Sequence, residues 1–71
     1  MSASLIIYGK DTCPYTTKAR KDFEERGIAF DYIDVQKDAA ALTRLLQLTD
    51  GYRQVPVIVD GDKVTIGYGG T

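Results

Sequence analysis

Apolar and polar positions along the chain follow the periods of strands and helices in turn. Residues 5–8 form a short apolar run rich in β-branched and aromatic side chains, and Gly9 closes it, which is typical of a buried strand. Apolar positions alternate less strictly over residues 30–34, and the runs 57–59 and 63–66 flank the turn sequence Asp60-Gly61-Asp62. These patterns predict two separate strands followed by a β-hairpin.

A first helix is predicted over residues 14–26. Pro14 suits the first helical position, because its φ angle is already helical and its missing N–H has no partner to lose there. No other helix breaker occurs before Gly27, which supplies a C-terminal stop. The apolar ridge of this mostly charged helix is predicted from residues four apart: Tyr15, Ala19 and Phe23.

A second helix is predicted to begin after Asp38, whose carboxylate can accept from the first-turn N–H groups as an N-cap. Its apolar face has the spacing i, i+3, i+4, i+7 in Leu42, Leu45, Leu46 and Thr49. Asp50-Gly51 ends it. The element order β-α-β-α-β-β predicts an α/β fold in one domain over residues 1–71, a βαβ unit followed by a hairpin.

Charge and hydropathy exclude several classes of partner. Nine basic residues against ten acidic ones leave a net charge of −1, so there is no electrostatic reason to expect a nucleic-acid or membrane-surface partner. No apolar run approaches the roughly 20 residues of a membrane span, and the start of the chain lacks the basic and apolar segments of a leader. We therefore expect a cytoplasmic protein.

The chain has one cysteine, Cys13, and no histidine. An internal disulfide is impossible, and the ligand count excludes a zinc site built from cysteine and histidine within one chain. Catalytic arrangements that need an imidazole base are excluded for the same reason. A reactive Cys13 must therefore be activated by backbone groups and cations.

Cys13 stands where a helix N-terminus can provide that activation. If Pro14 is the first helical residue, Cys13 is the N-cap, and its sulfur faces the free N–H groups of Tyr15 and Thr16 and the positive end of the helix dipole. Lys10, three residues upstream, adds a positive charge. These features favour the thiolate, the form that attacks disulfides. The alternative, a buried packing cysteine, fits this polar junction between strand and helix less well.

The run from Tyr8 to Thr16, Tyr-Gly-Lys-Asp-Thr-Cys-Pro-Tyr-Thr, resembles the active-site segment of glutaredoxins. The Val55-Pro56 pair before the third strand is similar too, and the resemblance covers about residues 5–67. It implies a minimal thioredoxin-like fold with a four-stranded mixed sheet. It also implies that Pro56 is in cis beside the catalytic Cys13, although the residues alone also allow an ordinary trans proline that opens an edge strand. The motif residues around Cys13 are Thr12, Pro14, Tyr15 and Thr16.

The resemblance also implies a binding site for glutathione, the co-substrate that forms a mixed disulfide with Cys13. Lys10, Tyr15 and the backbone of Val55 would hold it, with the neighbouring positions Pro56 and Gly67 completing the site. Read individually, Lys10 could be a solvated lysine and Tyr15 a packing residue. Three further side chains could bind a carboxylate of glutathione or could simply be surface residues: Arg44, Arg53 and Gln54.

Two departures from the family pattern shape the expected activity. Thr16 stands where the two-cysteine motif has its second cysteine, so Cys13 must be resolved by an outside thiol such as glutathione, which is a monothiol mechanism. The family continues into a last helix, so the expected fold is one that lacks the usual C-terminal helix. Residues 67–71 are too glycine-rich to form a stable helix alone, although Gly69-Gly70-Thr71 could imitate its beginning.

The ending also resembles the Gly-aromatic turn of redoxins that serve ribonucleotide reductase, at Gly67-Tyr68. Without a last helix, part of one sheet face would be uncovered, which favours a partner or a weak homodimer.

Three functions remain open from the sequence. The first is a monothiol oxidoreductase whose partners are glutathione and glutathionylated or disulfide-containing proteins. The second is a carrier of a [2Fe–2S] cluster between two subunits, in which two Cys13 and two glutathione thiolates supply four sulfur ligands. Most dedicated carriers of that kind have Gly-Phe-Ser after the cysteine, whereas this chain has Pro14-Tyr15-Thr16. The third is a non-catalytic module that binds a protein through the Val55 edge.

Overall fold

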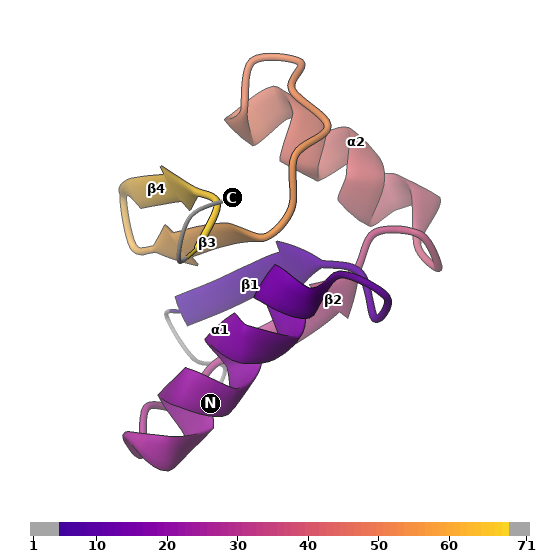
Figure 1. Cartoon of the computed structure of the whole chain (residues 1–71). Coiled ribbons are helices and arrows are strands. Elements are labelled where there is room, and N and C mark those ends of the chain that lie inside the picture. Colours follow the sequence, from indigo (N-terminus) through magenta and orange to yellow (C-terminus); the bar gives the residue numbers. More distant parts are fainter. Residues whose placement is uncertain (1–4, 69–71) are drawn as a thin grey trace.

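The computed structural model describes residues 5–68, and all six predicted elements are present in the predicted order (Figure 1). They are β1 (Leu5–Gly9), α1 (Pro14–Glu25), β2 (Asp31–Asp34), α2 (Ala39–Leu48), β3 (Val57–Asp60) and β4 (Lys63–Ile66). Their bounds differ from the predicted ones by a residue or so at some ends, where helices fray and strands lose their partner. The expectations for residues 1–4 and 69–71 lie outside the described residues.

The four strands form one mixed sheet in the order β2-β1-β3-β4. β1 pairs with β2 in parallel, with Ile7 opposite Tyr32. β3 pairs with β1 in the antiparallel direction, with Ile7 opposite Ile58, and β4 returns along β3. The parallel pair brings the ends of β1 and β2 to the same edge of the sheet, where the segments that follow them start.

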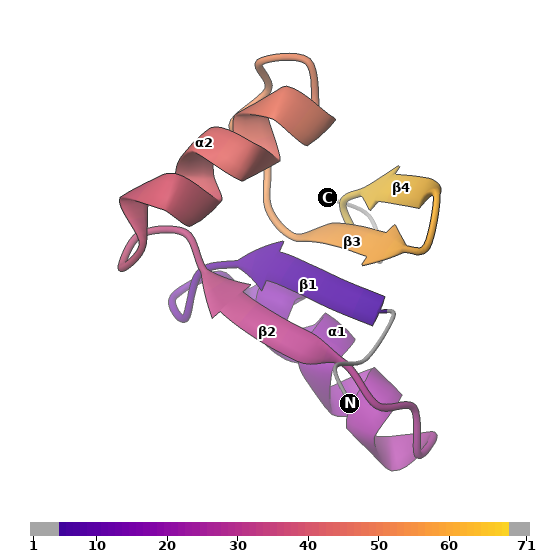
Figure 2. The ribbon, with the colours of Figure 1, turned by 180° about the vertical axis from the view of Figure 1, so that it is seen from behind.

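Each face of the sheet is covered by one helix (Figures 1 and 2). The buried cluster between α1 and the sheet consists of Leu5, Ile7, Ala19 and Ile58. The buried cluster between α2 and the sheet consists of Tyr8, Val35, Ala41, Leu45 and Val57. Ile7, Leu45 and Val57 are completely buried, and burial of each such side chain contributes roughly 1.5–3 kcal/mol to stability. The two clusters hold both helices, and therefore the loops at their ends, in place.

The buried face of α1 differs from the predicted ridge. Tyr15 is 38% exposed, whereas Thr16 and Ala19 are completely buried and Phe23 packs against the same cluster. The prediction that Tyr15 lies on the ridge was therefore wrong by one position. Residues at i, i+3 and i+7 share a helix face, and the polar hydroxyl of Thr16 hid its membership of that face from a pattern based on hydropathy.

The predicted start of α2 is confirmed. The Asp38 carboxylate accepts a hydrogen bond from the Ala41 N–H at 3.1 Å. The helix ends before a turn in which Asp50 and Gly51 both have positive φ angles, 59° and 95°. Among the described residues, no helix has the length and apolar content that crossing a membrane requires.

Candidate active site

Cys13 lies at the junction between the loop that follows β1 and the start of α1. Its φ and ψ angles of −87° and 118° are extended, and Pro14 is the first residue of the helix, so the predicted N-cap position is confirmed. The Cys13 N–H donates to the Lys10 carbonyl at 3.1 Å, and the Cys13 carbonyl accepts from the Thr17 N–H at 3.1 Å. These backbone bonds hold the cysteine from both sides.

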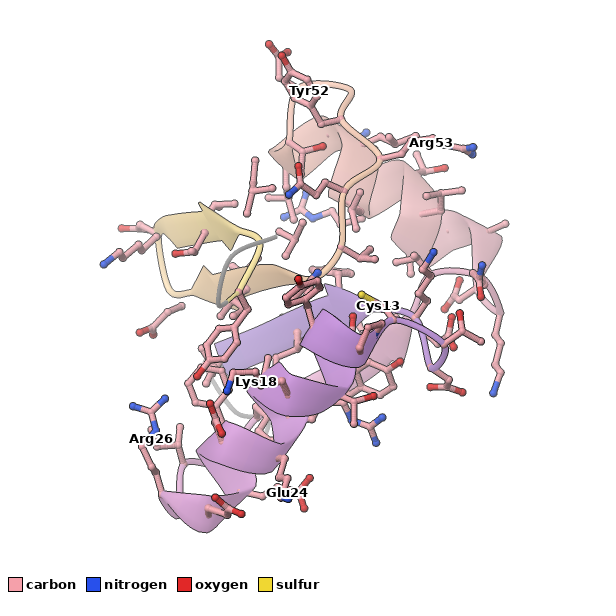
Figure 3. All side chains as sticks on the ribbon, in the orientation of Figure 1. Cys13, Lys18, Glu24, Arg26, Tyr52 and Arg53 are labelled. Atoms are coloured by element: carbon pink, nitrogen blue, oxygen red, sulfur yellow. The ribbon has the colours of Figure 1, made fainter. Side chains whose placement is uncertain are left out.

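The sulfur is buried against the segment that leads into β3, and the residue is 8% exposed (Figure 3). The thiol donates to the Val55 carbonyl, with 3.9 Å between Sγ and the oxygen. Within residues 5–68, the Cys13 side chain makes no capping hydrogen bond, so the expected direct contact with the first-turn N–H groups is not formed. A neutral thiol is a weak acceptor, and here its hydrogen is directed at the carbonyl instead.

The backbone beside the sulfur has the geometry that the resemblance implied. The Val55-Pro56 bond is cis, so the alternative of an ordinary trans proline was wrong. Pro56 is completely buried, and its carbonyl accepts from the Gly67 N–H at 2.7 Å. Gly67 has a φ of 86°, a conformation that favours glycine. The predicted residues Val55, Pro56 and Gly67 therefore lie together, with Val55 nearest to Cys13.

The pKa of the Cys13 thiol is lowered from its ordinary value. Burial raises this pKa, because it penalises the charged form, but four groups act more strongly in the opposite direction. They are the Thr16 hydroxyl, the N–H groups of Thr16 and Tyr15, and the Lys10 charge. The predicted influence of the helix N-terminus and of Lys10 is confirmed in direction. A larger fraction of Cys13 is therefore thiolate at neutral pH than for an ordinary cysteine.

A charged cluster fastens the loop that carries Cys13 to the end of β2. The Asp11 carboxylate accepts from the Tyr32 hydroxyl at 2.7 Å and from the Lys37 Nζ at 2.7 Å. The Asp11 N–H in turn donates to the Asp34 carboxylate at 3.1 Å, and the Arg20 guanidinium lies 3.9 Å from the centre of the Tyr32 ring. Lys37 and then Tyr32 hold the pKa of Asp11 below its usual value. Burial, followed by the hydrogen bond to Asp11, raises the pKa of Tyr32.

A cleft of about 640 Å³ opens beside Val55. Its lining combines apolar side chains with three cationic ones and one amide: Lys10, Val35, Gln36, Lys37, Ala39, Leu42, Leu45, Arg53 and Val55. Arg53 is labelled in Figure 3, on the segment after α2. The cleft therefore offers cations close to an extended stretch of backbone. Among the described residues, no backbone hydrogen bond involves the Val55 N–H.

The cleft brings together only some of the residues predicted for a ligand. Lys10, Val55 and Arg53 line it. Tyr15, Arg44 and Gln54 are exposed and do not line it. Pro56 and Gly67 are buried and do not line it either. Of the remaining motif residues, Thr12 and Pro14 are exposed and Thr16 is buried.

Sequence reasoning missed Gln36 and Lys37 at the cleft, and Asp11 in the loop. The available signal was topological: Gln36 and Lys37 follow β2, which runs parallel to β1, so they begin at the same sheet edge as the cysteine loop.

Comparison with known proteins gives the context of this site. The chain matches the protein family described as Glutaredoxin over residues 5–64. It is 32% identical over 66 residues to Glutaredoxin-C6 of rice, Oryza sativa subsp. japonica, and that match covers 89% of this chain and 59% of the rice protein. The chain thus spans less than two thirds of the length of this relative.

Two solved structures have a fold similar to that of this chain. The glutaredoxin of Archaeoglobus fulgidus is similar with a TM-score of 0.84 and 28% identity, covering 94% of this chain and 77% of its own. The glutaredoxin-like NrdH-redoxin of Escherichia coli, described as having a thioredoxin-like activity profile, is similar with a TM-score of 0.79 and 29% identity, covering 92% and 83%. The four-stranded mixed sheet with two helices is the thioredoxin-like fold of these proteins. This chain has that fold and belongs to the glutaredoxin family.

Proposed function

We propose that this protein is a monothiol thiol–disulfide oxidoreductase that removes glutathione from mixed disulfides through Cys13. The observation that carries the proposal is the position of the chain's single thiol at a helix N-terminus, with a lowered pKa and beside the Val55 backbone and a cationic cleft. Thiol–disulfide exchange requires a thiolate and a way to align the second sulfur with it. The family to which the chain belongs performs chemistry of this kind.

In the first step, the Cys13 thiolate attacks the glutathione sulfur of a glutathionylated substrate. The substrate's S–S bond breaks, a disulfide between Cys13 and glutathione forms, and the departing substrate thiolate takes a proton from solvent. In the second step, a free glutathione thiolate attacks the glutathione sulfur of this mixed disulfide. Oxidised glutathione forms and the Cys13 thiolate is released. Over both steps, the substrate thiol is released and one free glutathione joins the glutathione of the substrate as oxidised glutathione, and no second thiol of the chain is needed.

The cleft supports glutathione as the ligand. Glutathione is a short peptide with two carboxylates, and the cleft presents Lys10, Lys37 and Arg53 next to an extended backbone. A peptide can pair with the Val55 N–H and C=O as an added strand would, while arginine and lysine bind its carboxylates. Pairing at Val55 would displace the Cys13 S–H from the Val55 carbonyl, which suits a reaction that begins with loss of that proton.

The decisive experiment measures removal of glutathione from a glutathionylated peptide, with free glutathione as reductant, by wild type and by Cys13→Ser. We expect a rate above background only for wild type, and intact mass should show one glutathione added to wild type in quenched samples. Absence of both the rate and the adduct would refute the proposal.

A matched pair of arginines tests the cleft. Arg53→Ala should raise the KM for glutathione by roughly three- to tenfold, in line with loss of one partly exposed charge-assisted contact. Arg44→Ala removes the same charge from an exposed position on α2 outside the cleft, so its KM should stay at the wild-type value. Equal effects of both substitutions would mean that only overall charge matters.

The E. coli redoxin favours a second candidate, reduction of protein disulfides independently of glutathione, because its activity profile is described as thioredoxin-like. With one thiol in this chain, an external dithiol would have to resolve the mixed disulfide at Cys13. Turnover with dithiothreitol but none with glutathione would favour this second candidate over the first.

A further inference from the structure

Lys37 brings a cation to the cleft that is already paired with an anion of the chain. It lines the cleft together with Lys10 and Arg53, and its Nζ lies 2.7 Å from Oδ2 of Asp11. Among the residues that the structure describes, this Nζ has no other hydrogen-bond or ion-pair partner. The Lys37 side chain is 73% exposed, so a ligand can reach it. A carboxylate that approaches Lys37 in the cleft therefore meets a cation that Asp11 already holds.

The Asp11 carboxylate is held in place independently of Lys37. Its other oxygen, Oδ1, accepts from the Tyr32 hydroxyl at 2.7 Å, and the Asp11 N–H donates to the Asp34 carboxylate at 3.1 Å. Both partners belong to β2, which is paired with β1 and so fixed beside the cysteine loop. Asp11 therefore stays where it is when Lys37 turns toward a ligand, and it competes with the ligand for the same ammonium group.

The other two cations of the cleft have no such competitor. Within residues 5–68, neither Lys10 nor Arg53 forms an ion pair. Arg20 also approaches Asp11, with 3.9 Å between the guanidinium and Oδ1, but Arg20 does not line the cleft. An anionic ligand consequently finds two cations that it can pair with at no cost to the protein, and a third for which it must displace Asp11.

We propose that Asp11 is a specificity-determining residue of the cleft: by occupying Lys37, it weakens the preference of the cleft for ligands that carry several carboxylates. This inference deepens the proposed function and rests on it, because it concerns the choice among disulfides that exchange with Cys13. With Asp11 in place, disulfides of weakly charged thiols compete with those of glutathione better than they would without it. The substrate class is accordingly broader than glutathione adducts.

The electrostatics of the pair agree with this assignment. The hydrogen bond between the two side chains is the largest cause both of the lowered pKa of Asp11 and of the raised pKa of Lys37. Each shift favours the charged form, so both groups are charged at neutral pH. An ion pair that is exposed to solvent is weak, and a ligand carboxylate can therefore replace Asp11. The effect of Asp11 on ligand choice is thus a graded reduction of preference.

The test compares two disulfides as reagents for Cys13: oxidised glutathione, which is anionic, and bis(2-hydroxyethyl) disulfide, which has no charge. In each reaction the Cys13 thiolate attacks one sulfur, the S–S bond breaks, a mixed disulfide forms and the other half leaves as a thiolate. Intact mass of quenched samples gives both second-order rate constants. Their ratio cancels changes in the fraction and nucleophilicity of the thiolate, which affect both reagents alike. A variant that merely disturbs the loop therefore leaves the ratio unchanged.

Asp11→Asn keeps an acceptor for the Tyr32 hydroxyl but frees Lys37, and it should raise the ratio in favour of oxidised glutathione by about two- to fivefold, the range for one exposed ion pair. Asp34→Asn is the matched control, because it removes a neighbouring charge and leaves the pair of Asp11 and Lys37 intact. At physiological ionic strength its ratio should stay within about 1.5-fold of wild type. Lys37→Gln should lower the ratio more in the Asp11→Asn background than in wild type, since only there is Lys37 free for the ligand.

Three results would each overturn the inference: a wild-type ratio in Asp11→Asn, an equal rise in Asp34→Asn, or the same effect of Lys37→Gln in both backgrounds. The last two would mean that only the summed charge near Cys13 matters. Circular dichroism reports whether each variant is folded, and Asp11→Ser is a second variant without the carboxylate. Formation of the mixed disulfide is a single exchange that needs no turnover. A failure of the proposed function would therefore appear in the deglutathionylation rate, whereas a failure of this inference would appear in the ratio.

Discussion

The contact between Gly9 and Thr16 makes a strong prediction about stability. A Cβ at Gly9 would lie 2.4 Å from Thr16 Cγ2, 1.0 Å short of ordinary van der Waals contact, which begins at 3.4 Å. Neither side can move easily. Gly9 is paired with Asp34 in the sheet, and Thr16 is held on α1 by the buried cluster around Ala19. Gly9→Ala therefore forces a methyl group into a fully packed contact between the sheet and a helix.

Overpacking of this kind costs about 1–3 kcal/mol. Removing a glycine from the unfolded chain offsets roughly 0.4–1 kcal/mol of that cost. We therefore expect Gly9→Ala to lower the free energy of unfolding by about 1–2 kcal/mol. With a urea m-value of about 1 kcal/mol/M for so small a domain, the unfolding midpoint should fall by roughly 1–2 M.

A double-mutant cycle identifies the cause. Thr16→Ala removes both clashing atoms and leaves only its Cβ, 3.1 Å from the added methyl, so the double variant should regain about 1 kcal/mol relative to the sum of the single effects. Gly27→Ala is the matched control. It has open space around the added Cβ but a φ of 71°, so it should cost about 1–2 kcal/mol with no coupling to Thr16→Ala. Additive effects of Gly9→Ala and Thr16→Ala would refute the steric reasoning.

Four further predictions concern a helix cap, a charged cluster, the thiol and a tyrosine. Asp38→Ala removes the N-cap of α2 and should cost about 1 kcal/mol in urea unfolding, whereas Asp38→Asn should retain most of the stability. Because the pKa of Asp11 is lowered in the folded state, its contribution to stability is complete above the ordinary aspartate pKa and is lost as pH falls through the lower folded one. The urea midpoints of wild type and Asp11→Asn should therefore differ at neutral pH and converge in acid, and parallel curves would contradict this. Lys10→Gln should raise the pKa of the Cys13 thiol, which iodoacetamide alkylation would show as a shift of the reactivity profile to higher pH, smaller at high salt. In an alkaline titration followed by tyrosinate absorbance, Tyr32 should ionise after an ordinary tyrosine, and Asp11→Asn should bring its ionisation to lower pH.

The sequence by itself determined the element order and the position of Cys13 at the start of a helix. Strand and helix periods differ, and Pro14, Gly27 and Asp38 act through local backbone geometry and local hydrogen bonds, so their effects are legible without the rest of the fold. The same holds for Cys13 as an N-cap, because a residue's relation to its own helix N-terminus needs no distant partner. The absence of a second thiol is likewise a matter of composition.

Only the tertiary structure decided which side chains meet across the sheet. The contact of Val55 with Cys13 joins residues 42 positions apart. The residues Val55 and Pro56 alone allow both isomers of the bond between them, which is cis in the folded chain. The Asp11 cluster depends on the parallel pairing of β1 and β2, and the cleft depends on where α2 and the segment after it lie.

Thr16 shows most clearly why this information is not local. Its hydroxyl marks it as a surface residue by hydropathy, yet it is the buried residue that touches Gly9, while the aromatic Tyr15 is exposed. Which face of α1 turns inward is set by the angle at which the helix crosses the sheet, and that angle follows from the packing of both buried clusters rather than from the order of residues in the helix.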